Sequence, residues 1–265
     1  MTTDSPLASN DRDGGRAVLW DATLAARSPL FWPIAGAIEA LVAEMSSEAA
    51  GGTEASFPQP ETIDAALAAR AGVRFVRQRP VSRRRRGPPR DPEAMYDARI
   101  AREGCVPTRP GSWHDLMNAL VWATFPEAKR ALHQRQDGLV VPASPGESAR
   151  RPRELDALAL LDEGGLIVMT RGSRPATDED LARAIQAGEA TVLVFGHAIY
   201  EGIALGRTAP LASAVCIASD EAGAPSLGSA DRALAAVVAD RAQIIDPHAM
   251  LRLRADEQLV PAKKA

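Results

Sequence analysis

Two short motifs hold the residue types best able to do chemistry in this chain. In the first, His114 and Asn118 lie one helical turn apart, with Asp115 beside the histidine. In the second, His197 and Glu201 have the same four-residue spacing, which places both on one helix face. Histidine with a carboxylate can exchange protons near neutral pH or bind a metal ion. All five residues are therefore candidate catalytic residues.

The first motif is expected at the start of a helix. The helix dipole there disfavours a second proton, so the imidazole of His114 is expected to stay neutral and available as a base or ligand. The alternative is structural. His114 would then bond to backbone and Asn118 would fix a neighbouring loop, as buried polar side chains usually do.

The second motif follows a predicted strand that ends at Phe195, where Gly196 turns the chain into a helix. Sites in α/β sheets tend to form at the carboxyl ends of strands. His197 and Glu201 could share a metal ion, although the spacing lacks the second histidine of the zincin motif. The alternative is an ordinary hydrogen-bonded pair on a helix edge.

Further candidates are acidic or basic residues near predicted turns. Asp156 precedes an apolar run and is the best candidate for a buried acid, whereas Asp162 and Glu163 are most simply explained as turn residues. Arg109 precedes the helix of the first motif. It could bind a carboxylate or phosphate there, or it could tie its own loop down.

Because the rare polar residues gather in two motifs, we expect the motifs to converge. His197 should face the first turn of the helix that carries His114, so that both line one concave pocket. Separate structural roles at opposite ends of the molecule are the alternative. A separation of more than about 12 Å would exclude a shared metal ion or proton relay, because ligand distances are near 2 Å.

Periodicity and turn signals predict the elements that must position these residues. The predicted helices cover residues 30–45, 62–67, 92–103, 112–124, 126–135, 177–186, 230–240 and a segment starting at 197. The predicted strands cover residues 73–76, 157–161, 166–170, 191–195 and 212–217, with a hairpin turn at 162–165 and a rigid turn at 107–111. We expect an α+β fold, in which a mainly helical N-terminal half packs against a small mixed sheet from the C-terminal half. Trp113, Trp122, Phe125 and Tyr96 are expected in the core.

Charge is distributed unevenly. Nine arginines and no acid fall within residues 70–90, and without them 22 basic residues remain against 34 acidic ones. Nucleic-acid or anionic-membrane binding over the whole surface is therefore disfavoured. The run Arg83, Arg84, Arg85 and Arg86 favours a solvated loop, with a phosphate-binding arm as the alternative. Residues 1–18 and 79–90 are predicted to be disordered, and 1–18 and 256–265 to be tails around one globular domain, 19–255.

Composition also excludes common functional classes. Cys105 and Cys216 form no CxxC pair or zinc pattern, which suits a reducing compartment. Residues 1–18 lack the apolar core of a signal peptide, and residues 30–45 contain too many breaks to span a bilayer. We expect a cytoplasmic protein without a membrane partner. P-loop, GxGxxG, GxSxG and HExxH motifs are absent, which disfavours nucleotide-dependent enzymes and serine hydrolases.

Two runs carry a family resemblance. WHDLMNALVW at residues 113–122 and FGHAIYE at 195–201 are similar to the bacterial family called domain of unknown function 3025. The resemblance covers about residues 20–205. Asp97 stands where the family pattern has Glu, and His133 where it has Asn. The resemblance implies no activity, cofactor or catalytic residue.

The favoured hypothesis is an intracellular enzyme with a His/carboxylate site, metal-assisted hydrolysis being one option. The alternative is a non-enzymatic protein-interaction or nucleic-acid accessory protein, in which the WHD and GHAxYE motifs are structural. Cofactor, metal and ligand stay open, the ligand being an unidentified small molecule or protein.

Overall fold

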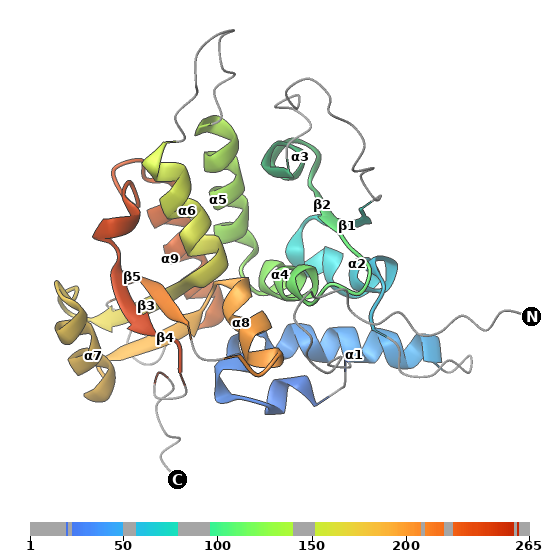
Figure 1. The fold of residues 1–265 in the computed structure, drawn as a ribbon, viewed down its shortest axis with the longest axis horizontal. Helices are drawn as coiled ribbons and strands as arrows, with labels where there is room; N and C mark the ends of the chain where they lie inside the picture. Colours follow the sequence, from blue (N-terminus) through green and yellow to red (C-terminus); the bar gives the residue numbers. More distant parts are fainter. Residues whose placement is uncertain are drawn as a thin grey trace, which may run out of the picture.

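The computed structural model describes residues 20, 23–49, 57–78, 96–139, 152–207, 210–219, 225–256 and 259. Within these ranges, nine α-helices accompany a two-stranded and a four-stranded sheet. Figure 1 shows how the elements are arranged. The expected α+β class is confirmed. The segments predicted to be disordered, 1–18 and 79–90, lie outside the described residues, and so does the arginine run 83–86.

The N-terminal half is helical, as expected. Two 3-10 helices (Leu24–Ala26 and Pro29–Ile34) are followed by α1 (Ala35–Ala49), α2 (Pro60–Ala71), α3 (Tyr96–Glu103), α4 (Trp113–Thr124) and α5 (Pro126–Leu139). β1 (Arg74–Arg77) and β2 (Cys105–Thr108) form a parallel pair beside them. The first two residues of the turn expected at 107–111, Pro107 and Thr108, therefore belong to β2, and the prediction is wrong for them. Pro107 is tolerated in a strand because a two-stranded sheet leaves one side of each strand without a ladder partner.

The C-terminal half contributes the larger sheet. Its strands are β3 (Gly165–Arg171), β4 (Ala190–Val194), β5 (Leu211–Ser219) and β6 (Leu251–Arg254), in the order β4-β3-β5-β6. β3 and β5 are parallel and the other two pairs are antiparallel, so the sheet is mixed. The helices of this half are α6 (Arg153–Gly164), α7 (Asp178–Gln186), α8 (His197–Ala204) and α9 (Leu227–Ala239). The sequence did not predict β6, and Ser226 rather than Ser229 caps α9.

The strand expected at 157–161 and the hairpin turn at 162–165 are wrong. These residues form the second half of α6, which passes directly into β3. The run Ala157–Leu161 contains only alanine and leucine, which are strong helix formers, and a short apolar run has no period that separates strand from helix. Asp162 and Glu163 consequently lie on the last turn of a helix.

The core joins both halves of the molecule. Trp113, Trp122 and Phe125 are buried, as expected, and pack in one cluster with the apolar residues of β3, β4 and β5. Tyr96 was also expected in the core, but 41% of its surface is exposed, so this expectation is wrong. Among the described residues, no helix is long and apolar enough to cross a membrane.

Gly196 sets the distance between α6 and α8. A Cβ on Gly196 would collide with the backbone of Glu163, Gly164 and Gly165. The amides of Phe195 and Gly196 both donate to the carbonyl of Gly165, at 3.0 and 2.9 Å. Because the backbones touch here, the end of α6 lies directly beside the start of α8.

Candidate functional site

The two sequence motifs meet where three helix ends come together. His114 lies in the first turn of α4, His197 begins α8, and the last turn of α6 lies beside them (Figure 1). The Nε2 atoms of the two histidines are 3.0 Å apart. The predicted convergence is confirmed, far inside the 12 Å limit that a shared metal ion or proton requires.

Glu163 completes a group of three possible metal ligands. One of its carboxylate oxygens lies 3.4 Å from Nε2 of His197 and the other lies 3.9 Å from Nε2 of His114. Within the described part of the chain, these three residues form the one cluster that could hold a metal ion, with their ligand atoms within 4.8 Å of one another. The sequence pattern favours a turn at Glu163, because a strand is expected before it.

Glu201 orients His114. Its carboxylate accepts a hydrogen bond from Nδ1 of His114 at 3.1 Å, which leaves Nε2 to face His197. This hydrogen bond, supported by the negative charges of Glu163 and Asp115, raises the pKa of His114 above its usual value although burial opposes the shift. This direction is opposite to the effect that the helix dipole was expected to have on His114.

His197 has the opposite electrostatic character. Its side chain is 3% exposed, and burial, helped by the positive charges of Lys129 and His114, lowers its pKa to about 3. Its Nδ1 lies 4.0 Å from a carboxylate oxygen of Asp162. The pair thus combines a histidine whose pKa is raised with one whose pKa is lowered, which suits either a shared proton or a shared metal ion.

A buried lysine stands behind Asp162. The ammonium of Lys129 donates to Asp162 and to Oδ1 of Asn118, the latter at 2.7 Å, and Nδ2 of Asn118 donates to the hydroxyl of Tyr96 at 2.9 Å. Burial alone would raise the pKa of Asp162, but Lys129, foremost among its neighbours, lowers it far below the usual range. Asn118 therefore fixes the interior of the site rather than a loop.

Three other candidates lie elsewhere or have structural partners. The carboxylate of Asp115 accepts from the backbone amide, Nε and Nη2 of Arg109, at 2.6, 2.9 and 2.7 Å. This bidentate pair supports the loop-tying alternative for Arg109 rather than anion binding. Asp156 is exposed on α6, so the expectation of a buried acid is wrong.

Asp97 and His133, which were expected to differ from the family pattern, contact each other. Nδ1 of His133 lies 3.0 Å from a carboxylate oxygen of Asp97. The ring of His133 also stacks on Trp122 at 5.4 Å with an interplanar angle of 6°. A buried histidine on α5 is thus paired with an acid on α3.

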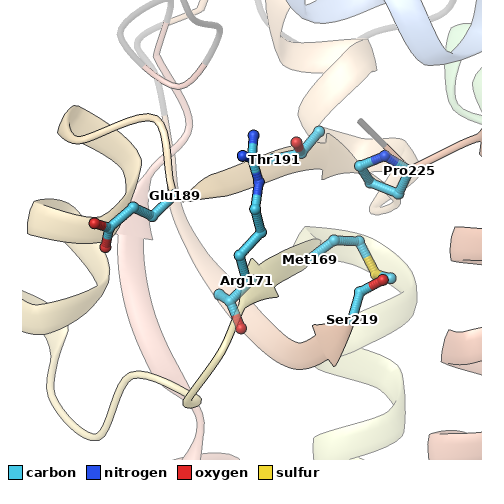
Figure 2. Close-up of a pocket in the computed structure, with 7 residues that line it drawn as sticks. Met169, Arg171, Glu189, Thr191, Ser219 and Pro225 are labelled. Carbon is cyan, nitrogen blue, oxygen red and sulfur yellow. The ribbon is translucent and has the colours of Figure 1, made fainter. Parts of the chain in front are cut away.

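The histidine pair is reached from the surface. The side chains of His114 and Glu163 are 34% and 50% exposed, whereas His197 lies beneath them. The expected concave pocket is not confirmed. A hollow of about 230 Å³, open to solvent, lies instead at the carboxyl ends of β3 and β5, lined among others by Arg171, Glu189 and Ser219 (Figure 2).

A comparison with known proteins places the chain in a family. Residues 73–254 match the model of a family described as a protein of unknown function, DUF3025, and the chain belongs to this family. The match contains all the site residues described above, and begins later and extends further than the resemblance seen in the sequence. No curated protein and no solved structure matches the chain.

Proposed function

We propose that this DUF3025 protein is a metal-dependent hydrolase whose divalent ion is bound by His114, Glu163 and His197. The observation that carries the proposal is the 3.0 Å separation of the two Nε2 atoms, with one carboxylate beside both. Two nitrogen ligands of one zinc ion lie about 3–3.4 Å apart when each is about 2 Å from the metal. The spacing therefore suits a single ion between the rings.

The donor set is typical of catalytic rather than structural sites. Two imidazoles and one carboxylate leave a fourth position for water or substrate, and a metal-bound water becomes a nucleophile near neutral pH. The partial exposure of His114 and Glu163 makes that position accessible to solvent. Hydrolysis is the reaction class that such an arrangement supports most directly.

Charge and orientation also support a cation at this point. Asp162, Glu163 and Glu201 supply three carboxylates around the two rings, whereas Lys129 is the one fully buried cation beside them in the described chain. A divalent ion would offset the remaining negative charge. Glu201 on Nδ1 of His114 matches the carboxylate–histidine–metal arrangement, which fixes the tautomer and raises the basicity of the ligand.

The opposite pKa shifts of the two histidines favour a second candidate, a metal-free acid–base pair. His114, protonated on both nitrogens, would donate from Nε2 to the neutral Nε2 of His197. Both candidates suit a cytoplasmic enzyme, since Cys105 and Cys216 are free thiols. Metal binding separates the two directly.

The test is to titrate the purified full-length chain with Zn²⁺ and Co²⁺ by calorimetry after dialysis against a chelator. One ion per chain is expected, with binding lost in His197→Ala and Glu163→Gln. His133→Asn is the matched control, because His133 is a buried histidine with its own carboxylate outside the cluster. Absence of binding, or equal loss in the control, would reject the metal site. A hydrolase screen with the Co²⁺-loaded chain then tests the reaction.

A further inference from the structure

Resting on the proposed metal site, we infer that Lys129 is a positioning residue for its ligands and acts through Asp162. Lys129 contacts none of the three proposed ligands by a hydrogen bond. Its ammonium instead holds the carboxylate behind His197, on the residue that precedes Glu163. It would therefore set the geometry of two of the three ligands from behind.

The first support is the rigidity of the surroundings of Lys129. The side chain is completely buried, and its ammonium lies 5.6 Å from the ring centroid of Trp122. Asn118 on α4 and Asp162 on α6 accept its hydrogen bonds, so three helices meet at one charged group. A cation held from three sides restricts where the carboxylate of Asp162 can lie.

The second support is the symmetry of the two histidines. Glu201 lies on Nδ1 of His114 at 3.1 Å, and Asp162 lies toward Nδ1 of His197 at 4.0 Å. Each ring thus presents Nε2 to the cluster, but only His114 has a hydrogen-bonded carboxylate on Nδ1, because Nδ1 of His197 is buried and makes no hydrogen bond to the described residues. Ligating histidines typically have such a partner on the nitrogen that faces away from the metal. The contact to His197 is longer than a hydrogen bond, so its position depends on what holds Asp162.

The third support is that stability alone does not require this pair. Replacing a buried ion pair by apolar groups of similar volume is often neutral or stabilising. Lys129 nevertheless holds a carboxylate that lies behind His197, 4.0 Å from its Nδ1. We attribute the position of Lys129 and Asp162 to the metal ligands that they orient.

The test compares the double variant Lys129→Met/Asp162→Asn with the wild-type chain, using Co²⁺ alone as the probe. Removing both charges leaves no unpaired buried ion, so the variant is expected to keep its melting temperature. Loss of an outer-shell partner should weaken Co²⁺ binding by about 10- to 100-fold and change the visible absorption of the bound ion. Arg135→Met is the control, because it disrupts a buried cation on the same helix away from the ligands.

The outcomes separate this inference from the proposed function. If the wild-type chain binds no Co²⁺, both are overturned. If the wild type binds and the double variant binds with the same affinity and spectrum, Lys129 is structural and only this inference fails. Asn118→Ala is the second variant in case the double variant does not fold. It removes one partner of Lys129 and should weaken binding by about tenfold or less.

Discussion

Helix α5 carries two buried cations, Lys129 and Arg135, which have different kinds of partner. Arg135 donates to Glu154 at 2.7 Å and to the carbonyls of Val238, Asp240 and Gln243 at 2.7, 3.1 and 2.7 Å. These carbonyls end α9 and begin the turn after it. Lys129 instead meets side chains, one of which borders the histidine pair.

The difference between Lys129 and Arg135 shows that burial of a charge does not by itself indicate function. The guanidinium fork of Arg135 suits several fixed acceptors at once, and cations near helix C-termini also gain from the helix dipole. These contacts are sufficient to explain Arg135 as a structural residue that holds the end of α9 in place. Around Lys129, the neighbouring groups have pKa values shifted in opposite directions within one cluster, which is the pattern typical of functional sites.

The largest expected effect comes from breaking the structural clamp. Arg135→Met should lower stability by about 3–5 kcal/mol, because Glu154 and the end of α9 lose their buried partner. Urea unfolding measures the loss, and Co²⁺ binding should stay at the wild-type level. A loss of Co²⁺ affinity without a stability change would remove the distinction between the two cations.

Lys129→Met should have a comparable or slightly smaller effect that depends on pH. In the wild type, the lowered pKa of Asp162 stabilises the fold above the usual aspartate pKa of about 4, and this stabilisation is lost only as the pH falls through the lower folded value. Without Lys129, burial raises the pKa of Asp162, so the variant gains stability on acidification. The stability gap should therefore narrow between pH 7 and pH 4. A gap independent of pH would contradict the pairing.

Glu201→Gln should have a moderate effect on stability. It tests whether Glu201 is the carboxylate partner of His114. Losing a hydrogen bond to a charged group costs about 1.5–3 kcal/mol, less here because His114 is partly exposed. The raised pKa of His114 stabilises the fold below its unfolded value near 6.5, and this contribution disappears as the pH rises through the folded value. Melting curves from pH 5 to 9 should therefore show a smaller difference from wild type at high pH. The reverse trend would argue against Glu201 as the partner of His114.

The smallest effect is expected from an exposed cation. Arg109 is 55% exposed and pairs with Asp115 outside the ligand set. Arg109→Ala should cost about 1 kcal/mol or less, since exposed pairs contribute little. Thermal melting and Co²⁺ titration should both remain near wild type. A large loss of metal binding would show instead that Arg109 contributes to the metal site.

Local sequence determined the helices that carry the two motifs. Ser112 caps α4 as its spacing to Asp115 predicts, and Thr177 caps α7 in the same way. The four-residue spacing of His197 and Glu201 also placed both on α8. These features involve neighbours within one or two turns, where capping and periodicity act without help from the rest of the chain.

Only the tertiary structure decided what the motifs face. The alanine- and leucine-rich run of α6 has no distinctive period, and its helical state put Glu163 beside two histidines instead of on a hairpin. Glycine at 196 allows the start of α8 to touch the backbone at the end of α6, a requirement that no local pattern predicts.

The contacts that make the site join residues far apart in the chain. His114 and Glu201 are 87 positions apart, and Lys129 and Asp162 are 33 positions apart. Sequence identified the two histidines because rare residues at helix starts are conspicuous. It missed Lys129, because a charged residue on a helix is usually solvated and only packing reveals that it is buried. It assigned Asp162 and Glu163 to a turn, because a strand was expected before them.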